Sequence, residues 1–479
     1  MGRQEAPVKF KTTLIVFAVF VLLLAFILLF ESGEKQGLDA EGKLVFFPSE
    51  NISRIDFLSE GETISLMKNE ESDWSIIQPL ETAADQYEAG RMADDFSDLS
   101  FNHVVEEEPD PSDLEKYGIP QKTVTLHFKD GSDPVKVLIG MENPLDKTYF
   151  AKREDEARVV LIPSTLKNQL EKKLFDFRKK DLFQFETASV GRIAIQTADR
   201  KIEAEKQETG WFLTQPVKSL AQQSLLTGIL SNLNGLKAKE FLAEEKGEED
   251  LKKWGLDRPG YAVTLDMPTE GTTLNILLNK QDETVYATSS LSSKIVTVDD
   301  TLLADLDKEI TEFRGKDVAE FYSWEAGKLR IKKSGLDTTL AKSEENDWLF
   351  DQTAGSESPE TADRSKVDAF IREVEGLEAA GWIDPPFDLA SYGLQDPQVE
   401  ITIWVKEGDE DRPITIFVGS KDEESGQVFV KNDALDYLFK VDAAFLEKIP
   451  ASASDWKTEA PTGQKAMDPE EKEEIKQDA

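Results

Sequence analysis

The sequence DLEKYG at residues 113–118 returns twice in altered form, as DLKKWG at residues 250–255 and as DLASYG at residues 388–393. The final glycines of these hexapeptides are 137 and 138 residues apart. A solenoid repeat is about 20 to 50 residues long, so this period is the size of a whole domain. The spacing predicts three tandem copies of one module.

Other residues recur in the same order and with the same period. The repeated tryptophans are Trp74, Trp211 and Trp348, each 137 residues from the next. A glutamine follows each tryptophan after four residues. Agreement among separate marks indicates tandem duplication, and we assign the modules to residues 44–182, 183–318 and 319–456.

Each copy shows the same coarse pattern. Stretches such as ISRIDFL alternate apolar and polar residues, which is typical of strands. A segment with apolar residues every three or four positions predicts a helix, and a second group of strands and a closing helix follow it. Runs of strands interrupted by single helices favour an α+β module with mostly antiparallel pairing and two helices.

The hexapeptide itself predicts a structural turn. Its Asp can cap one turn of helix, its Leu and aromatic residue share one face, and its Gly can adopt the left-handed conformation that ends the turn. The aromatic and glycine positions are Tyr117, Gly118, Trp254, Gly255, Tyr392 and Gly393. Three aromatic binding sites are the alternative, but buried anchors explain the spacing with fewer assumptions.

A second motif closes only the first two copies. It reads FRKKD at residues 177–181 and FRGKD at residues 313–317, whereas the third copy ends in FLEKIPASASDW. We predict that the charged residues of this motif fix the orientation of one module against the next; simple divergence of the last copy is the alternative. These residues are Arg178, Lys180, Asp181, Arg314, Lys316 and Asp317.

The N-terminal region carries an unbroken apolar run of 17 residues at residues 14–30. With the two preceding threonines it reaches about the length of a membrane-spanning helix, so we predict a transmembrane helix over residues 12–30. Basic residues precede the run and acidic residues follow it, which places residues 1–11 in the cytoplasm and the modules outside, after a linker at residues 31–43. A cleaved signal peptide is the alternative, but the run exceeds the usual 7 to 15 or so residues and lacks a clear A-x-A site.

The composition narrows the classes of partner. The chain has 94 acidic and 56 basic residues among 479 and a formal net charge of −38, which argues against nucleic acid, because Lys and Arg supply most of that affinity. It contains no cysteine, which excludes disulfides and thiolate metal sites. Residues 457–479 are polar and charged, and we predict that this acidic tail is disordered.

Catalytic motifs are not evident in the sequence. The two histidines, His103 and His127, align with unlike residues in the other copies, so we interpret both as surface residues. No nucleotide-binding glycine motif and no metal-binding motif occurs, so we expect no cofactor and no bound metal. Paired carboxylates of a hydrolase stay open, because nothing singles out a pair among so many acids.

The anchor, the W-x-x-x-Q-P marks and the D-L-x-x-[YW]-G turns together resemble the bacterial family known as domain of unknown function 4340. The third copy departs from the pattern, because Pro is missing after Gln352 and the closing motif is absent. The resemblance implies a protein encoded beside an ABC-type transport system related to gliding-motility auxiliary proteins, and it supplies no active site. We therefore expect a single-pass inner-membrane accessory or scaffold subunit that is not an enzyme and whose partner is an ABC-type permease or another inner-membrane protein. An extracytoplasmic ligand- or glycan-binding protein and an envelope hydrolase are the alternatives.

Overall fold

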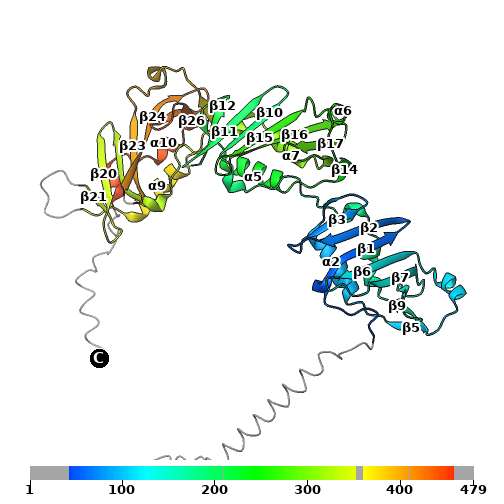
Figure 1. Cartoon of the computed structure of the whole chain (residues 1–479). Coiled ribbons are helices and arrows are strands. Elements are labelled where there is room, and N and C mark those ends of the chain that lie inside the picture. The colour runs from blue at the N-terminus through cyan, green and yellow to red at the C-terminus, as the bar shows by residue number, and fades with distance from the viewer. Residues whose placement is uncertain (1–41, 209, 352–359, 409, 458–479) are drawn as a thin grey trace, which may run out of the picture. The chain divides into compact units, whose positions relative to one another are not determined.

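The computed structural model of the chain (Figure 1) describes the modules and leaves out both ends. The described residues are 42–208, 210–351, 360–408 and 410–457. The predicted cytoplasmic segment, the transmembrane helix, nearly all of the linker and the predicted tail from residue 458 onward lie outside these residues. Among the residues described, no helix is long and apolar enough to cross a membrane. The chain divides into two compact units between Lys180 and Asp181, so the second and third modules share one unit.

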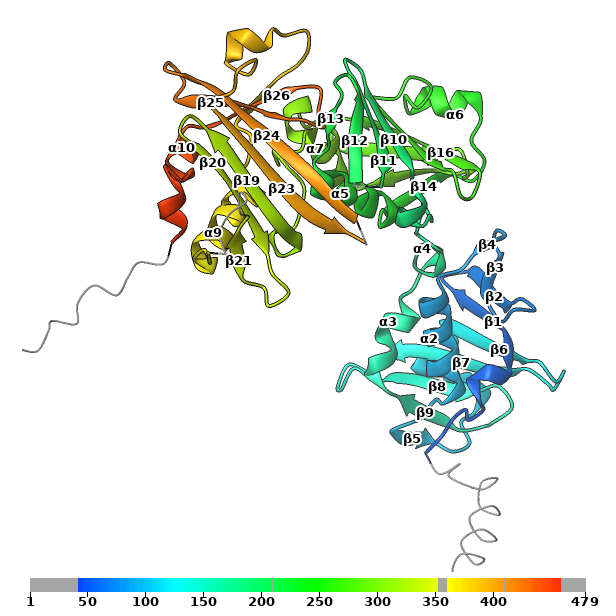
Figure 2. The same ribbon diagram turned by 90° about the vertical axis from the view of Figure 1, so that its left-hand side faces the viewer.

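In the first module, nine antiparallel strands form one sheet in the order β4-β3-β2-β1-β6-β7-β8-β9-β5. The strands are β1 (Ile52–Ser59), β2 (Glu62–Lys68), β3 (Trp74–Gln78), β4 (Thr82–Ala83), β5 (His103–Glu106), β6 (Lys122–Phe128), β7 (Val135–Glu142), β8 (Tyr149–Arg153) and β9 (Val159–Ile162). Helix α2 (Gln86–Ser97) lies against the sheet (Figure 2) and buries Met92 and Phe96. Two single turns, α3 (Lys167–Leu170) and α4 (Leu174–Phe177), close the module.

The second module repeats this plan with the strand order β13-β12-β11-β10-β15-β16-β17-β18-β14. Its strands are β10 (Arg192–Thr197), β11 (Lys201–Gln207), β12 (Gly210–Gln215), β13 (Ser219–Leu220), β14 (Glu240–Ala243), β15 (Tyr261–Met267), β16 (Thr272–Gln281), β17 (Thr284–Ser289) and β18 (Ile295–Val298). Its helices are α5 (Gln223–Asn234), α6 (Glu248–Lys253), α7 (Thr301–Leu306) and α8 (Ile310–Phe313).

The third module has the order β21-β20-β19-β23-β24-β25-β26-β22. Its strands are β19 (Ala326–Lys333), β20 (Leu336–Lys342), β21 (Trp348–Phe350), β22 (Gly381–Ile383), β23 (Val399–Glu407), β24 (Glu410–Asp422), β25 (Gln427–Asn432) and β26 (Leu438–Asp442). Its helices are α9 (Arg364–Glu375) and α10 (Phe445–Lys448). Three antiparallel sheets thus match the three repeats.

The two groups of strands predicted for each module join into a single sheet. The first strand of the opening group pairs with the first strand of the later group, and the register is the same in each module. The matching pairs are Ile55 with Leu126, Ile193 with Leu265, and Leu329 with Ile403. All six of these side chains are buried. Each module has its own hydrophobic core, in which the long helix covers the apolar face of the sheet.

The predicted closing helix differs from the one observed. In the first module it is split into α3 and α4, because Lys173 adopts an extended conformation between them. The break turns the Phe177 ring into the core, where it is fully buried. The second module is split in the same way between α7 and α8. A continuous helix would carry this aromatic ring past the core.

Candidate functional site

The repeated tryptophans belong to the module cores. Trp74, Trp211 and Trp348 lie in β3, β12 and β21 and are at most 5% exposed. Gln86, the first residue of α2, accepts a hydrogen bond from the Trp74 N–H (2.6 Å) and donates one to the Trp74 carbonyl (2.9 Å). Gln223 holds Trp211 in the same way (2.8 and 3.0 Å). These two glutamines share the 137-residue spacing of the tryptophans, the signal that could have identified them from the sequence.

The glycines of the hexapeptide turns adopt the left-handed conformation. The φ angles of Gly118, Gly255 and Gly393 are 65°, 66° and 66°. In the first and third modules, the carbonyl of the preceding aromatic residue lies so close to Gly140 of β7 or Gly419 of β24 that any Cβ there would collide with it. In the second module Asn279 takes this place, and its Nδ2 donates to the Trp254 carbonyl (2.9 Å). Each turn is thus docked on the later group of strands.

The aromatic rings of these turns are half-buried, not fully buried, and each packs against one ring of the sheet. The pairs are Tyr117 with Phe150, Trp254 with Tyr286, and Tyr392 with Phe429, with centroids 4.9, 6.3 and 4.8 Å apart. The Asp of the motif is the N-cap residue in the third module, where Asp388 accepts from the Ala390 N–H (3.2 Å). In the second module Asp250 lies one turn later and accepts from the N–H of the N-cap residue Gly247 (3.1 Å). In the first module the turn already begins at Pro111, whose ring favours the first helical position, so Asp113 lies inside it.

A buried aromatic residue closes every module, including the third. The carbonyl of Phe177 accepts a hydrogen bond from the Asp85 N–H (2.8 Å), directly before helix α2. In the second module the Gln222 N–H donates to the carbonyl of Phe313 (2.7 Å), and in the third module the Asp363 N–H donates to the carbonyl of Trp456 (2.6 Å). Trp456 therefore takes the place of the phenylalanine of the closing motif, and it is the charged residues of that motif that are absent from the third copy.

Arg314, which follows the closing phenylalanine of the second module, reaches into the third module. Its guanidinium makes two hydrogen bonds to Asp384 (3.0 and 2.9 Å) and lies over the rings of Trp382 and Tyr437, 4.8 and 5.1 Å from their centroids. The Arg314 side chain is 5% exposed and that of Asp384 is 39% exposed. A paired, ring-covered guanidinium fixes both distance and direction, because its donors lie in one plane.

Tyr437 connects the same two modules from the other side. Its hydroxyl accepts a hydrogen bond from the Leu220 N–H (3.1 Å), and both residues are buried. Burial raises the pKa of Tyr437 to about 12, so the hydroxyl is neutral at ordinary pH. Leu220 also accepts from the Gly315 N–H (2.8 Å), next to Arg314. Leu220 of β13 is thus held both by Tyr437 of the third module and by Gly315 of the second. We call this region of contact between the second and third modules the joint.

Lys316 and Asp317 pair through their backbones with the segment that follows helix α9. The Ala379 N–H donates to the Lys316 carbonyl (2.7 Å), and Asp317 forms an antiparallel bridge with Glu378. Asp181 forms the same bridge with Lys237 in the second module. The aspartate that ends the motif in the sequence therefore pairs within the module that follows.

The motif residues of the first unit have contacts of their own. Arg178 is 5% exposed and forms an antiparallel bridge with Ala84. The Lys180 ammonium donates to the carbonyls of Asp176 (2.9 Å) and Arg178 (3.4 Å) and lies 5.0 Å from the centroid of Phe175. The backbone of Arg178 thus belongs to the same edge as its counterpart Arg314, which bridges Ala221.

Two carboxyl groups at the start of the third module have raised pKa values. Burial, with the charge of Glu378 nearby, raises the pKa of Asp317. Burial and then the charge of Asp317 raise the pKa of Glu320, although Arg412 acts in the opposite direction. Protonation of either group therefore favours the folded joint.

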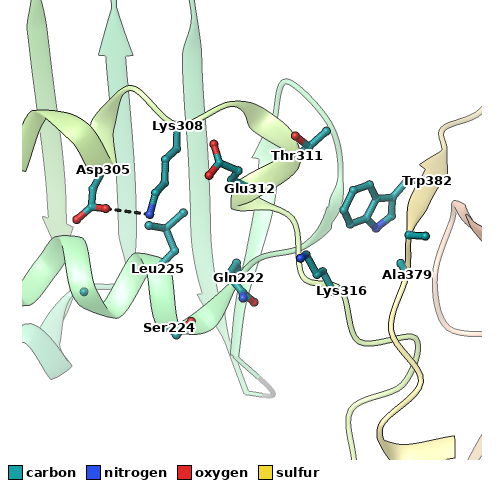
Figure 3. Close-up of a pocket in the computed structure, with 12 residues that line it drawn as sticks. Gln222, Ser224, Leu225, Asp305, Lys308, Thr311, Glu312, Lys316, Ala379 and Trp382 are labelled. Atoms are coloured by element: carbon teal, nitrogen blue, oxygen red, sulfur yellow. Dashed lines mark ion pairs between the residues drawn. The ribbon is translucent and has the colours of Figure 1, made fainter. Parts of the chain in front are cut away.

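A cleft of about 650 Å³ lies beside the joint (Figure 3). Helix α5 forms one wall, the stretch of α7 and α8 forms the opposite wall, and the segment leading into β22 closes one end. The lining side chains include Gln222, Ser224, Leu225, Asp305, Lys308, Thr311, Glu312, Lys316 and Trp382. Its volume lies in the range of about 300 to 1,000 Å³ that is usual for small-molecule sites.

The cleft combines ionic, polar and aromatic groups. Lys308 forms an ion pair with Asp305 (2.9 Å), and Glu312 accepts from the Glu309 N–H (3.0 Å). Among the residues that the structure describes, the Lys316 ammonium has no hydrogen-bond or ion-pair partner. The indole Nε1 of Trp382 is buried and likewise lacks an acceptor there.

Both histidines belong to the first module. His127 Nε2 is 2.9 Å from Asp56 Oδ2 on the first sheet, and His103 is exposed in β5. Within the described ranges, no group of three or more His, Asp or Glu residues is placed to hold a metal ion. The residues repeated in all three modules have contacts that belong to packing or to backbone pairing.

The comparisons with known proteins give one match. The sequence profile described as "Domain of unknown function (DUF4340)" matches three tandem segments, residues 74–212, 211–387 and 384–478. Each segment begins at or after the third strand of one sheet, so the profile and the sheets divide the same repeat at different points. No curated protein and no solved structure is significantly similar to the chain. Because the three matched segments cover well over half of its length, the chain belongs to the DUF4340 family.

Proposed function

We propose that the protein is a non-catalytic accessory or scaffold subunit of an ABC-type transport system in a bacterial envelope. In this proposal residues 12–30 anchor it in the inner membrane, and the three modules lie outside the cytoplasm. The partner is the permease or another inner-membrane protein of the system. The charge asymmetry around the apolar run supports the orientation.

The observation that carries the scaffold role is the joint of the second unit. Arg314, Asp384 and Tyr437 commit buried or half-buried polar groups to holding two modules in one arrangement. Burying charges gains little stability by itself, whereas a paired guanidinium strongly disfavours other orientations. A fixed relation between modules is what a subunit needs if it is to present two surfaces at once.

The modules also share their structural residues and differ at chemically reactive ones. The positions common to all copies, the tryptophan, the turn glycine and the closing aromatic, have packing or backbone contacts. The position of His127 carries Asp266 and Trp404 in the other copies. Divergence of this kind supports a spacer built by duplication more than a catalyst built three times.

Co-purification from detergent-solubilised membranes tests the partner. We compare the full-length protein with a form lacking residues 1–43 and a form comprising residues 1–182. The linker can extend no more than about 40 Å, which keeps the first module near the bilayer, so residues 1–182 should retain the permease. Recovery of the permease only with the anchorless form, or recovery of no membrane protein at all, would contradict the proposal.

Protease accessibility tests the orientation separately. Protease added to intact spheroplasts should digest the modules, while a cytoplasmic marker protein stays whole. Complete protection of the modules in intact spheroplasts, followed by digestion after lysis, would place them on the cytoplasmic side.

A further inference from the structure

The first module provides an internal reference for the cleft beside the joint. On the corresponding face of that module, Lys172 forms an ion pair with Glu88 of helix α2. Lys180 lies over the Phe175 ring and donates to two backbone carbonyls, as described above. Both of these lysines are thus engaged by the first module itself.

Two substitutions open the same face in the second module. Leu225 occupies the place of Glu88, and Thr311 occupies the place of Phe175. Lys308, the counterpart of Lys172, pairs instead with Asp305 on its own wall. Lys316, the counterpart of Lys180, has lost both its ring and its carbonyl acceptors. As far as the structure describes the chain, the second module therefore has an unpaired lysine, Lys316, and an open cleft where the first module has an ion pair and a covered lysine.

The remaining lining groups indicate the chemistry of an occupant. The side chains of Gln222, Ser224 and Thr311 have no hydrogen-bond partner within the described part of the chain, so an amide and two hydroxyls are available. The half-buried indole of Trp382 lines the end of the cleft (Figure 3). An aromatic surface can pack against C–H groups, while the amide and hydroxyl groups can bind the edge of the same molecule.

The charge of the lining is balanced. The lining contains two lysines, Lys308 and Lys316, and two acids, Asp305 and Glu312, so their formal charges cancel. The strongly acidic chain around the cleft disfavours polyanions. An ammonium and a carboxylate presented together suit hydroxyl groups, which both accept and donate hydrogen bonds. We propose that this cleft binds a short uncharged saccharide, with Trp382 as its stacking surface and Lys316 and Glu312 as hydroxyl ligands. This inference does not depend on the proposed scaffold role.

Binding is tested by isothermal titration calorimetry with the full-length protein in detergent. The probes are maltotriose, cellotriose and N,N′-diacetylchitobiose, with a trisaccharide of uronic acids and an uncharged tripeptide amide as comparisons. We expect at least one neutral saccharide to bind, and to bind more tightly than the acidic trisaccharide and the peptide.

The first module supplies the variants that close the cleft. Leu225→Glu should pair with Lys308 as Glu88 pairs with Lys172, and Thr311→Phe should cover Lys316 as Phe175 covers Lys180. Each should weaken saccharide binding about tenfold or more, whereas Lys180→Met, a substitution on the closed face, should leave it unchanged. Circular dichroism and the thermal midpoint establish that each variant is folded.

Three results would overturn the assignment. One is the absence of heat with every neutral saccharide at concentrations up to about 10 mM, the limit of weak specific binding. Another is unchanged binding in the folded Leu225→Glu and Thr311→Phe proteins. The third is tighter binding of the tripeptide amide or of the acidic trisaccharide than of any neutral saccharide.

Discussion

The second and third modules end in the same way up to one residue and then differ. Phe313 and Trp456 are both buried, and the carbonyl of each accepts from the residue before the long helix of its module. The next residue is Arg314 in one case and Lys457 in the other. The Arg314 side chain is 5% exposed and bound by the neighbouring module, whereas that of Lys457 is 46% exposed and pairs with Glu360 (2.6 Å).

This difference separates what a module needs in order to fold from what it needs in order to join. The aromatic closure is common to every copy and belongs to the core. In the second module the following cation is buried against an acid and two aromatic rings of the third module, whereas the cation after Trp456 is about half exposed. The two functions are adjacent in the sequence, so single substitutions can test them one at a time.

The largest effect is expected from removing the closure itself. Phe313→Ala and Trp456→Ala each delete a buried ring and leave a cavity, which should cost about 3 to 5 kcal/mol of unfolding free energy. Urea unfolding, followed separately for the two units, measures the loss. Similar losses at both positions support a common closure, and a loss below about 1 kcal/mol at Trp456 would show that it does not replace the phenylalanine.

Removing the cation that follows the closing aromatic residue should have different effects in the second and third modules. Arg314→Met leaves Asp384 without its partner, and because Asp384 is partly exposed we expect a loss of about 2 kcal/mol, less than for a fully buried pair. Lys457→Met removes an exposed ion pair and should change stability by less than about 0.5 kcal/mol. The same unfolding assay applies, and limited proteolysis should cut Arg314→Met faster between the modules. Equal effects of the two substitutions would contradict a joint-specific role.

The hydroxyl of Tyr437 sharpens the comparison further. Tyr437→Phe leaves the buried Leu220 N–H without the acceptor that the third module provides, which should cost about 1 to 2 kcal/mol. Tyr392→Phe is the matched control, because no bond to the Tyr392 hydroxyl occurs within the described residues and its ring keeps the contact with Phe429. Equal and negligible losses in the two variants would show that this hydrogen bond does not hold the modules together.

The sequence was a good guide to whatever is repeated. Three modules, antiparallel strands and the left-handed turn glycines follow from periods that are visible in the residues alone. The closing helix was wrong in detail, because apolar periodicity does not reveal the extended residue that splits it. Trp456 was missed as a closure because the hairpins between β23 and β25 are longer than their counterparts in the second module. They shift every later residue of the third copy, so Trp456 does not lie one 137-residue period after Phe313.

Only one side of the joint could be predicted from the sequence. Its charged residues stood out because they are absent after the third copy. Their partners, Asp384, Trp382 and Tyr437, belong to the next module and have no repeated mark, so only the fold brings them to Arg314. The cleft was not predicted at all, since it depends on two substitutions whose effect is clear only beside the closed face of the first module.

The smallest effect expected is a pH dependence of the stability of the second unit, caused by Asp317 and Glu320, which follow Arg314 in the chain. Asp317 and Glu320 have ordinary pKa values of 3.8 and 4.5, and burial raises both in the folded protein. Above these values the unfolded chain ionises first, so the two groups should lower the stability of the unit as the pH rises from about 4 toward neutrality. Below about pH 4 both states are protonated and the contribution vanishes.

Asp317→Asn combined with Glu320→Gln should therefore flatten this part of the stability profile, measured as the urea midpoint of the second unit between about pH 4 and pH 7. Asp299 is a control of opposite sign. Hydrogen bonds from Lys239 and Thr301 lower its pKa to about 2, so its contribution is present near neutrality and is lost as the pH falls toward that value. Asp299→Asn should thus lower the midpoint near neutrality, where the double substitution raises it. If the double substitution instead lowers the midpoint near pH 7, the two carboxylates stabilise the joint as ions, and the burial that distinguishes Arg314 from Lys457 does not extend to its acidic neighbours.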